Sequence, residues 1–531
     1  MRRPIVMLIE ATGIQEYIFG SNELAQNIGA SELVRRSTVN WVRDCLVGQF
    51  GAGGHNFTGL DERKDPELGD DQPGEAWRAE VVYAGGGNAM LLFADDGEAD
   101  AFARRLTEMV LRQAPGLHLV VQRASQPDGV DLATFHQTLR ACLAQRKLDH
   151  VPSTPLLGLG VTAECVFTGA PATGVHPRSG LPVSAEVVAK LAIQGEATDR
   201  LYAQVPRIRD SDYDFVYNFD QLGEKGESTY LAVVHADGNR MGQRIKDMGR
   251  EHRGDDRGYI RALRAFSESV QAAAARALQS TADLLLDALD VNEEGEEVIG
   301  GVVPVPGRHL PFRPIVFGGD DVTFVCEGRL GLNLATHYLD VYSSTVLSDK
   351  EPAHARAGVA VVSSHYPFSR AYDLAEDLCA SAKKRIAEID AGRRVTAIDW
   401  HFATSGLVRA LGEIRAREYT TAAGSLLSRP LRLDVPAQDW RTWATFAGLV
   451  YKFQKHRDWA RRRNKVKALR QALRDGPDAV RYFLATHRQP RELPEIPLRR
   501  DMALQGWQGG ECGYFDAIEA VDYFVPLQGE V

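Results

Sequence analysis

Two adjacent acidic residues interrupt an otherwise apolar stretch of the chain, PIVFGGDDVTFVCEG (314–328). Gly318 and Gly319 precede Asp320 and Asp321, and β-branched and aromatic residues lie on both sides. This pattern predicts two buried strands joined by a tight turn, in which glycine tolerates a positive φ and lets a ligand approach the backbone. Neighbouring carboxylates repel each other and are tolerated where they face water or hold a divalent cation. The hairpin is therefore a candidate metal site.

A third carboxylate, Asp237, ends the apolar stretch STYLAVVHAD (228–237). In a βαββαβ sheet the first strand lies beside the hairpin, so we expect Asp237 to converge with Asp320 and Asp321. Three hard oxygen donors suit Mg²⁺ or Mn²⁺. Two such ions about 4 Å apart are the usual device for in-line phosphoryl transfer, in which one activates a 3′-hydroxyl and the other neutralises the triphosphate.

The flanking residues favour a nucleotide ligand. The turn after Asp237 leads into a helix, whose free N–H groups and dipole attract phosphate. In the predicted helix 369–390, two lysines can reach the same sheet edge and neutralise phosphate charge. The predicted nucleotide-binding residues are Gly238, Asn239, Arg240, Gly242, Gly318, Gly319, Lys383 and Lys384.

Two units of the chain share one order of elements: strand, helix, hairpin, helix, strand. The first unit has a strand at 4–9, a glycine hairpin at 79–95, a helix at 97–114 and a strand at 117–123. The second has the strand ending at Asp237, a long helix at 256–289, the acidic hairpin, a helix at 330–347 and a strand at 357–363. AGGGNAMLLF (84–93) aligns with FGGDDVTFVC (317–326) without a gap. We interpret this as a duplicated ferredoxin-like motif in which Gly87 and Asn88 replace the two aspartates; two unrelated glycine hairpins are the alternative.

The predicted fold class is α+β. Beyond about residue 400 strand signals fade and helical periods dominate, at 402–431, 439–474 and 477–487. The predicted domains are 1–147 (first ferredoxin-like unit, without the acids), 148–226 (linker), 227–400 (second unit, with the acids) and 401–531 (helical bundle). The segment 451–474 is strongly basic, which fits an RNA contact, an acidic partner or a solvated helix face.

Composition narrows the class of protein. The chain has 531 residues and a net charge of −9, so its surface as a whole is not built to coat nucleic acid. The sequence contains no run of about 18 apolar residues, so no membrane span is predicted. The apolar run near the N-terminus is too short for a secretory signal. The six cysteines are scattered without a CxxC pair, which predicts a reduced, cytoplasmic protein. A nucleophile elbow for Ser/His/Asp hydrolysis is absent from the sequence.

Several motifs together resemble the large polymerase/cyclase subunit of type III CRISPR effector complexes. TGIQEYIFGSNELAQNIGASELV (12–34) is similar to that family's first palm signature, and HADGNRMG and FGGDD to its second, catalytic palm. AEDLCASAKK and TAIDWHFATSG are similar to the segments that close this palm. The resemblance implies two palm domains, ATP as substrate, and Asp237, Asp320 and Asp321 as metal ligands. It further implies cyclic oligoadenylates as product, and activation by a guide-RNA complex with other effector subunits.

The sequence departs from this family at two places. The first palm begins near residue 4, with no HD-type nuclease domain before it, so no DNase activity is expected. The linker has Cys165 but Thr168 where a second cysteine of a zinc motif would stand. His150 and His176 are further ligand candidates, yet zinc is not expected.

Two alternatives stay open. One is a GGDEF-like cyclase that makes cyclic dinucleotides, because GGDD also occurs in such domains. The other is a non-catalytic, RNA-binding scaffold of an effector complex. The sequence also leaves open a dimer, the base specificity and the ring size of the product.

Overall fold

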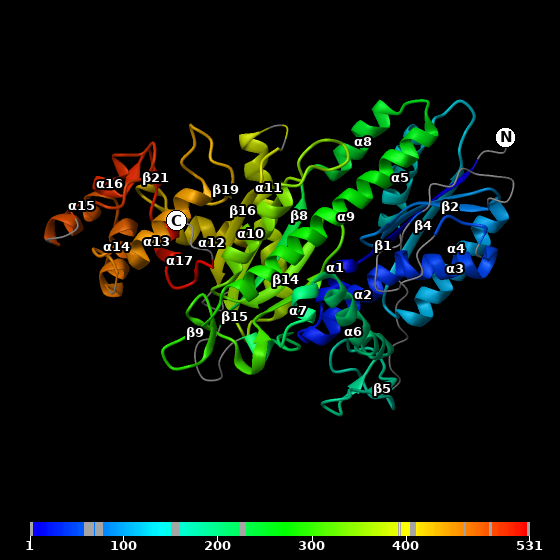
Figure 1. Cartoon of the computed structure of the whole chain (residues 1–531), viewed down its shortest axis with the longest axis horizontal. Coiled ribbons are helices and arrows are strands. Elements are labelled where there is room, and N and C mark those ends of the chain that lie inside the picture. The colour runs from blue at the N-terminus through cyan, green and yellow to red at the C-terminus, as the bar shows by residue number, and fades with distance from the viewer. Residues whose placement is uncertain are drawn as a thin grey trace.

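A computed structural model of the chain describes residues 4–51, 53–57, 68, 78–149, 160–222, 230–390, 392, 394–403, 410–460, 462–487 and 491–527. The molecule is elongated (Figure 1). The first palm lies at one end, the second palm in the middle and the C-terminal domain at the other end. Within the described ranges, every helix is too short or too polar to cross a bilayer.

The first palm is built on a four-stranded antiparallel sheet. Its strands are β1 (Ile5–Thr12), β2 (Ala79–Gly85), β3 (Asn88–Phe93) and β4 (His118–Ser125), in the order β2-β3-β1-β4. Met7 and Ile9 of β1 belong to one core, while Val6 and Leu8 face the other, as the period-two geometry of a strand requires. The helices of this palm are α1 (Ile14–Phe19), α2 (Leu24–Thr38), α3 (Asn40–Phe50), α4 (Asp96–Gln113) and α5 (Leu132–Leu148).

The second palm repeats this topology. The first four strands of its six-stranded sheet, in chain order, are β8 (Tyr230–Gly238), β13 (Phe312–Val316), β14 (Val322–Glu327) and β15 (Ala355–Ser363). They stand in the order β13-β14-β8-β15, which is the order of the first palm. The helices are α8 (Met241–Glu251), α9 (Asp256–Asp287), α10 (Gly331–Ser343) and α11 (Phe368–Ile389). The expected α+β class and the paired ferredoxin-like sheets are confirmed.

The two palms share their apolar cores. Leu8 of β1 packs in the same core as Val234 of β8 and residues of α9, and Met7 shares the other core with Val233. Helix α9 has 32 residues, roughly 48 Å of helix, and it runs from the second palm onto the first (Figure 1). The buried Glu80 of β2 accepts hydrogen bonds from Arg257 (2.6 Å) and Arg264 (3.0 Å) of α9. The palms are therefore fixed against each other, which matters for any cleft between them.

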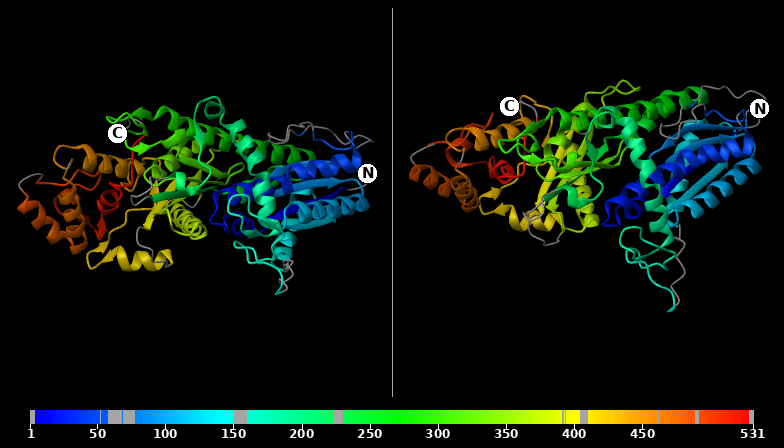
Figure 2. Two further views of the ribbon diagram at one scale, coloured as in Figure 1. Left: turned by 90° about the horizontal axis from the view of Figure 1, so that it is seen from below. Right: turned by 60° about the horizontal axis from the view of Figure 1, so that its bottom comes forward.

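The linker attaches to the first palm through α6 (Ala185–Gln204). This helix crosses α2 so closely that a Cβ on Gly29 would lie 1.8 Å from the Lys190 carbonyl oxygen, and only glycine fits there. The short hairpin of β5 (Gly174–Val175) and β6 (Pro182–Val183) projects from the body of the molecule (Figures 1 and 2). The candidate ligand His150 lies outside the described residues.

Beyond residue 400 the sequence prediction was partly wrong. The segment 402–431 was predicted to be helical, but its described residues, 402–403 and 410–431, form one helix, α12 (Leu411–Glu418). They also include the end of β16 (Ala397–Ala403) and the small strands β17 (Thr420–Thr421) and β18 (Gly424–Ser425). Strand β16 pairs in parallel with β15 and extends the sheet of the second palm, followed by β19 (Leu431–Arg432). The expected domain boundary at residue 400 thus falls inside a strand, because α11 acts as a crossover that returns the chain to the sheet.

The rest of the C-terminal domain is largely helical, as predicted. The segment 439–474 forms two helices rather than one, α13 (Trp443–Lys455) and α14 (Arg463–Asp475). The other helices are α15 (Pro477–Thr486), α16 (Met502–Gln505) and α17 (Phe515–Ala520). Strands β20 (Trp507–Gln508) and β21 (Glu511–Cys512) complete a small sheet with β17 and β18.

Candidate active site

The three acidic residues meet at one edge of the second palm's sheet. Asp237 lies at the end of β8, and Asp320 and Asp321 occupy the turn between β13 and β14. One carboxylate oxygen from each lies within 4.8 Å of the others. Gly318 (φ 114°) and Gly319 (φ 81°) have the positive φ values predicted for this turn. The backbone N–H of Gly238 donates to the Asp320 carbonyl oxygen (3.1 Å), which ties the turn to β8.

Desolvation and charge repulsion at this edge of the sheet disfavour three ionised carboxylates without a cation. Asp237 and Asp320 are half-buried and Asp321 is exposed. Desolvation and repulsion from Asp321 raise the pKa of Asp320, and desolvation and repulsion from Glu376 of α11 raise the pKa of Asp321. The charge of Asp237 is offset, because the buried Arg356 of β15 donates to it.

This donor set fits a divalent metal ion. Carboxylate oxygens are the ligands that Mg²⁺ and Mn²⁺ prefer, and a cation would relieve the repulsion that raises the two pKa values. Within the described ranges, Asp237, Asp320 and Asp321 form the one cluster of three acidic, histidine or cysteine side chains close enough to share an ion. Arg356 also donates to the Gly238 carbonyl oxygen (3.1 Å) and to Asn239 Oδ1 (2.8 Å), so it holds Asp237 from the side of β15.

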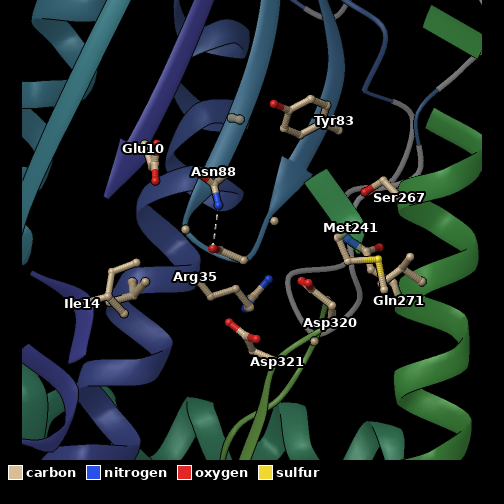
Figure 3. Close-up of a pocket in the computed structure, with 18 of the residues that line it drawn as sticks. Glu10, Ile14, Arg35, Tyr83, Asn88, Met241, Ser267, Gln271, Asp320 and Asp321 are labelled. Carbon is tan, nitrogen blue, oxygen red and sulfur yellow. Dashed lines mark hydrogen bonds between the residues drawn. The ribbon is translucent and has the colours of Figure 1, made fainter. Parts of the chain in front are cut away.

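The acidic turn forms part of the wall of a cleft between the two palms, with a volume of about 410 Å³. The glycine hairpin of the first palm (85–88) lines this cleft together with the acidic turn, and Figure 3 shows Arg35 of α2 between the two hairpins. Arg140 of α5 and Arg200 of the linker helix α6 also line it. The second palm thus contributes two carboxylates, whereas the first palm and the linker contribute three guanidinium groups and the carboxylate of Glu10.

A buried carboxylate holds two of these arginines in place. Glu32 is 1% exposed and accepts hydrogen bonds from Arg35 (3.0 Å) and Arg200 (2.8 Å). Burial opposes the ionisation of Glu32, but the charges of Arg200 and Arg35 outweigh it and lower its pKa to about 2. The Arg200 guanidinium also lies 3.9 Å from the ring centroid of Phe317, directly before the glycine pair. No pattern in the sequence predicts these arginines, because they come from separate helices and belong to no local motif.

The predicted nucleotide-binding residues do not all face this cleft. Gly242 lines it, as do Gly318 and Gly319. Asn239 and Arg240 line a second cleft, of about 290 Å³, with Arg244 of α8. The side chain of Asn239 is buried and donates to the Val395 carbonyl oxygen (2.9 Å), so it braces the sheet edge rather than reaching the space between the palms.

Lys383 and Lys384 are exposed on α11. Cys379, one helical turn before Lys383, donates to the carbonyl oxygen of Arg356 (3.8 Å). Lys383 therefore lies on the side of α11 that faces the Arg356–Asp237 pair, while Lys384 is turned about 100° away from it. The same helix carries Glu376, which the sequence analysis also missed; it accepts a hydrogen bond from Gln15 of α1 (2.7 Å).

The corresponding edge of the first palm has a different chemistry. Glu10 takes the place of Asp237 and forms an ion pair with Lys147 of α5 (2.6 Å). Asn88 donates to the carbonyl oxygen of Gly86 (3.1 Å), which closes the glycine turn (Figure 3). This palm therefore presents a neutralised edge to the cleft.

Fold and site together define a protein of two packed palm domains with an acidic centre in the second. Residues 230–391 match the family model for Cas10/Cmr2, second palm domain. This match over the second palm confirms the resemblance to the large palm subunit of type III CRISPR effector complexes. A comparison with curated proteins gave no significant match.

Solved structures support the fold over nearly the whole chain. Csm1 in T. onnurineus is 16% identical, with a TM-score of 0.54, over 98% of this chain and 70% of that chain. A Csm1–Csm4 cassette in complex with pppApApA is 14% identical, with a TM-score of 0.55, over 99% and 70% of the chains. The cassette in complex with cA4 is 14% identical, with a TM-score of 0.53, over 98% and 69%. At these identities the likeness establishes the fold.

Proposed function

We propose that this protein is a nucleotidyl cyclase that converts ATP into cyclic oligoadenylates in type III CRISPR defence. The observation that carries the proposal is the position of Asp320 and Asp321 on the wall of the inter-palm cleft, beside Asp237 and opposite Arg35. Support comes from Csm1 structures of the same fold, which were solved in complex with one ATP, with pppApApA and with cA4.

In this reaction the 3′-hydroxyl oxygen of one nucleotide attacks the α-phosphorus of another. A phosphodiester bond forms, the bond to the β-phosphate oxygen breaks and pyrophosphate leaves, with the hydroxyl proton passing to solvent. Ring closure repeats this step between the two ends of the linear product. Asp237, Asp320 and Asp321 would hold two Mg²⁺ or Mn²⁺ ions, which supply hydroxyl activation and charge neutralisation.

Cationic side chains of the protein must neutralise the negative charge that two metal ions leave. Three carboxylates and a triphosphate of about −4 exceed the +4 of two metal ions by about three charges. Arg35 lines the cleft, and Lys383 lies on the side of α11 that faces the Arg356–Asp237 pair, so we assign phosphate binding to these two. The turn at Gly318 and Gly319 carries no side chain and lets the phosphates approach the backbone.

Partners follow from the same relatives. Csm1 was solved in a cassette with Csm4, as a subcomplex of the type III-A CRISPR-Csm interference complex. We propose that this chain assembles with a comparable subunit in the cytoplasm and responds to guide RNA paired with its target. We propose adenine as the base from the family resemblance and from the ATP, pppApApA and cA4 complexes of Csm1.

The test is incubation of the purified chain, alone and with co-expressed effector subunits, with each NTP and Mg²⁺ or Mn²⁺, followed by mass spectrometry. A cyclic oligoadenylate is expected, and Asp320→Ala/Asp321→Ala should abolish it. Glu293→Ala/Glu294→Ala, an exposed acidic pair outside the cleft, is the matched control. Consumption of GTP instead of ATP would favour a cyclic-dinucleotide cyclase. Absence of any product and of nucleotide binding would leave a non-catalytic scaffold.

A further inference from the structure

A basic surface lies far from the palm cleft. The segment 451–474 contains ten lysines and arginines and one aspartate, in a chain whose net charge is −9. Four of the twelve lysines of the chain lie in it. We call its exposed cationic side chains the basic surface; they are Lys452, Lys455, Arg457, Arg462, Arg463 and Lys467.

The fold orients these side chains toward solvent. Helix α13 buries Phe446 and Phe453, and α14 buries Val466, Leu469 and Leu473 in the core of the C-terminal domain. The end of α13, the connecting loop and the outer face of α14 thus carry the cations together. In Figure 1 these helices lie at the end of the molecule opposite the first palm.

Several side chains of the basic surface form no ion pair with the described residues of the protein. Arg463 pairs with Asp522 (3.2 Å), and Arg457 approaches Asp458 at 4.0 Å. Among the residues that the structure describes, Lys452, Lys455 and Lys467 form no ion pair. Like charges so close together cost free energy unless an anion offsets them, so a fold that keeps them exposed favours an external polyanion.

A cleft of about 230 Å³ opens on this surface, where the C-terminal domain meets the second palm. Arg463, Lys467 and Arg470 of α14 line one side of it, and Tyr523 lines another. Glu519 and Asp522 also line the cleft and pair with Arg470 (3.0 Å) and Arg463 (3.2 Å), so Lys467 is the cation of this cleft that forms no ion pair among the described residues. The Tyr523 ring is stacked on Phe402 of β16 with 4.7 Å between the ring centroids, and it is not fully buried. An aromatic ring beside a row of cations is the usual arrangement for binding a single-stranded nucleic acid, in which a base stacks and the phosphates pair.

We propose that the basic surface binds single-stranded RNA through its phosphates, with one nucleotide in the cleft beside Tyr523. An acidic protein is the less suitable occupant, because protein interfaces have an apolar centre and few lysines. Within the described part of 451–474 a single large apolar side chain, Tyr451 (42%), is exposed. The proposal is independent of the cyclase assignment, since it uses no residue of the palm cleft.

The test measures the affinity of the full chain for a fluorescent single-stranded RNA of about 16 nucleotides by anisotropy, between about 50 and 200 mM salt. Lys455→Gln/Lys467→Gln should weaken binding about tenfold and reduce the slope of log K against log salt by about 1.4. Lys246→Gln/Lys350→Gln removes the same charge from exposed positions elsewhere and should change neither quantity by much. DNA of the same sequence should bind within about threefold, because the contacts are to phosphate.

Three results would overturn the proposal. The first is that the wild-type chain fails to bind RNA. The second is that the Lys455/Lys467 and the Lys246/Lys350 variants lose the same affinity. The third is that polyglutamate of equal charge displaces the labelled RNA as well as unlabelled RNA does. The last result would identify an acidic protein as the occupant. An unchanged thermal unfolding midpoint of each variant excludes loss of fold as the cause of weaker binding.

Discussion

Asp320→Asn/Asp321→Asn distinguishes a metal site from a solvated turn without relying on activity. The three ligand oxygens lie within 4.8 Å of one another. At that distance two unit charges repel by about 3.5 kcal/mol at an effective dielectric constant of 20, and by about 0.9 kcal/mol in water. Because Arg356 offsets Asp237, the main repulsions are those of Asp321 with Asp320 and with Glu376. The amides should therefore raise the free energy of unfolding in metal-free buffer by about 1–3 kcal/mol.

The effect should depend on pH in a defined direction. Desolvation and the neighbouring carboxylates raise the pKa of Asp320 to about 7 and that of Asp321 to about 6, above the value near 3.9 of an unfolded chain. Each carboxyl then binds its proton more tightly in the folded state. The wild type should lose stability relative to the variant as the pH rises from about 4 to about 7, with no further change above.

The assay is thermal unfolding in EDTA and in Mn²⁺, with Glu293→Gln/Glu294→Gln as a control that removes the same number of charges. At a Mn²⁺ concentration about 100-fold above its Kd the wild type should gain about 2.7 kcal/mol, and the aspartate variant much less. The reasoning is refuted if the aspartate variant is less stable than the wild type in EDTA at pH 8, or if Mn²⁺ stabilises both proteins equally.

Two further predictions concern the edges of the cleft. Lys383→Ala should raise the KM for ATP at least about tenfold, which corresponds to about 1.4 kcal/mol. Lys384→Ala should have little effect in the same steady-state assay, and the reverse pattern would show that the other face of α11 meets the phosphates. Gly87→Asp/Asn88→Asp should not create a second acidic centre, because Gly87 has φ 77° and a Cβ there would lie 2.8 Å from Ile14 Cδ1. Equilibrium dialysis should give the same Mn²⁺ stoichiometry for this variant and the wild type, and additional bound Mn²⁺ would contradict the assignment.

The failed predictions share a physical cause. The segment 397–403 was interpreted without its partner strand, so the strand β16 beyond residue 400 was assigned to a helical region. Its residues alternate, with Ile398, Trp400 and Phe402 on one face and Asp399 and His401 on the other, and all five are buried. Such alternation is typical of a strand, but it does not say which strand the segment pairs with; the parallel pairing with β15 places it in the sheet of the second palm.

The repeated βαββαβ units and the acidic hairpin could be predicted from the sequence, because both depend on local signals. Alternating burial predicts the strands, glycine predicts the positive φ of the turn, and Asp237 follows from its place at the end of a strand. The tertiary structure alone decided what lies opposite those acids. Arg35 and Arg200 are 165 residues apart in the chain and meet through the buried Glu32, and Arg356 reaches Asp237 only because β15 pairs with β8. Such convergence depends on packing between separate elements, which no local pattern encodes.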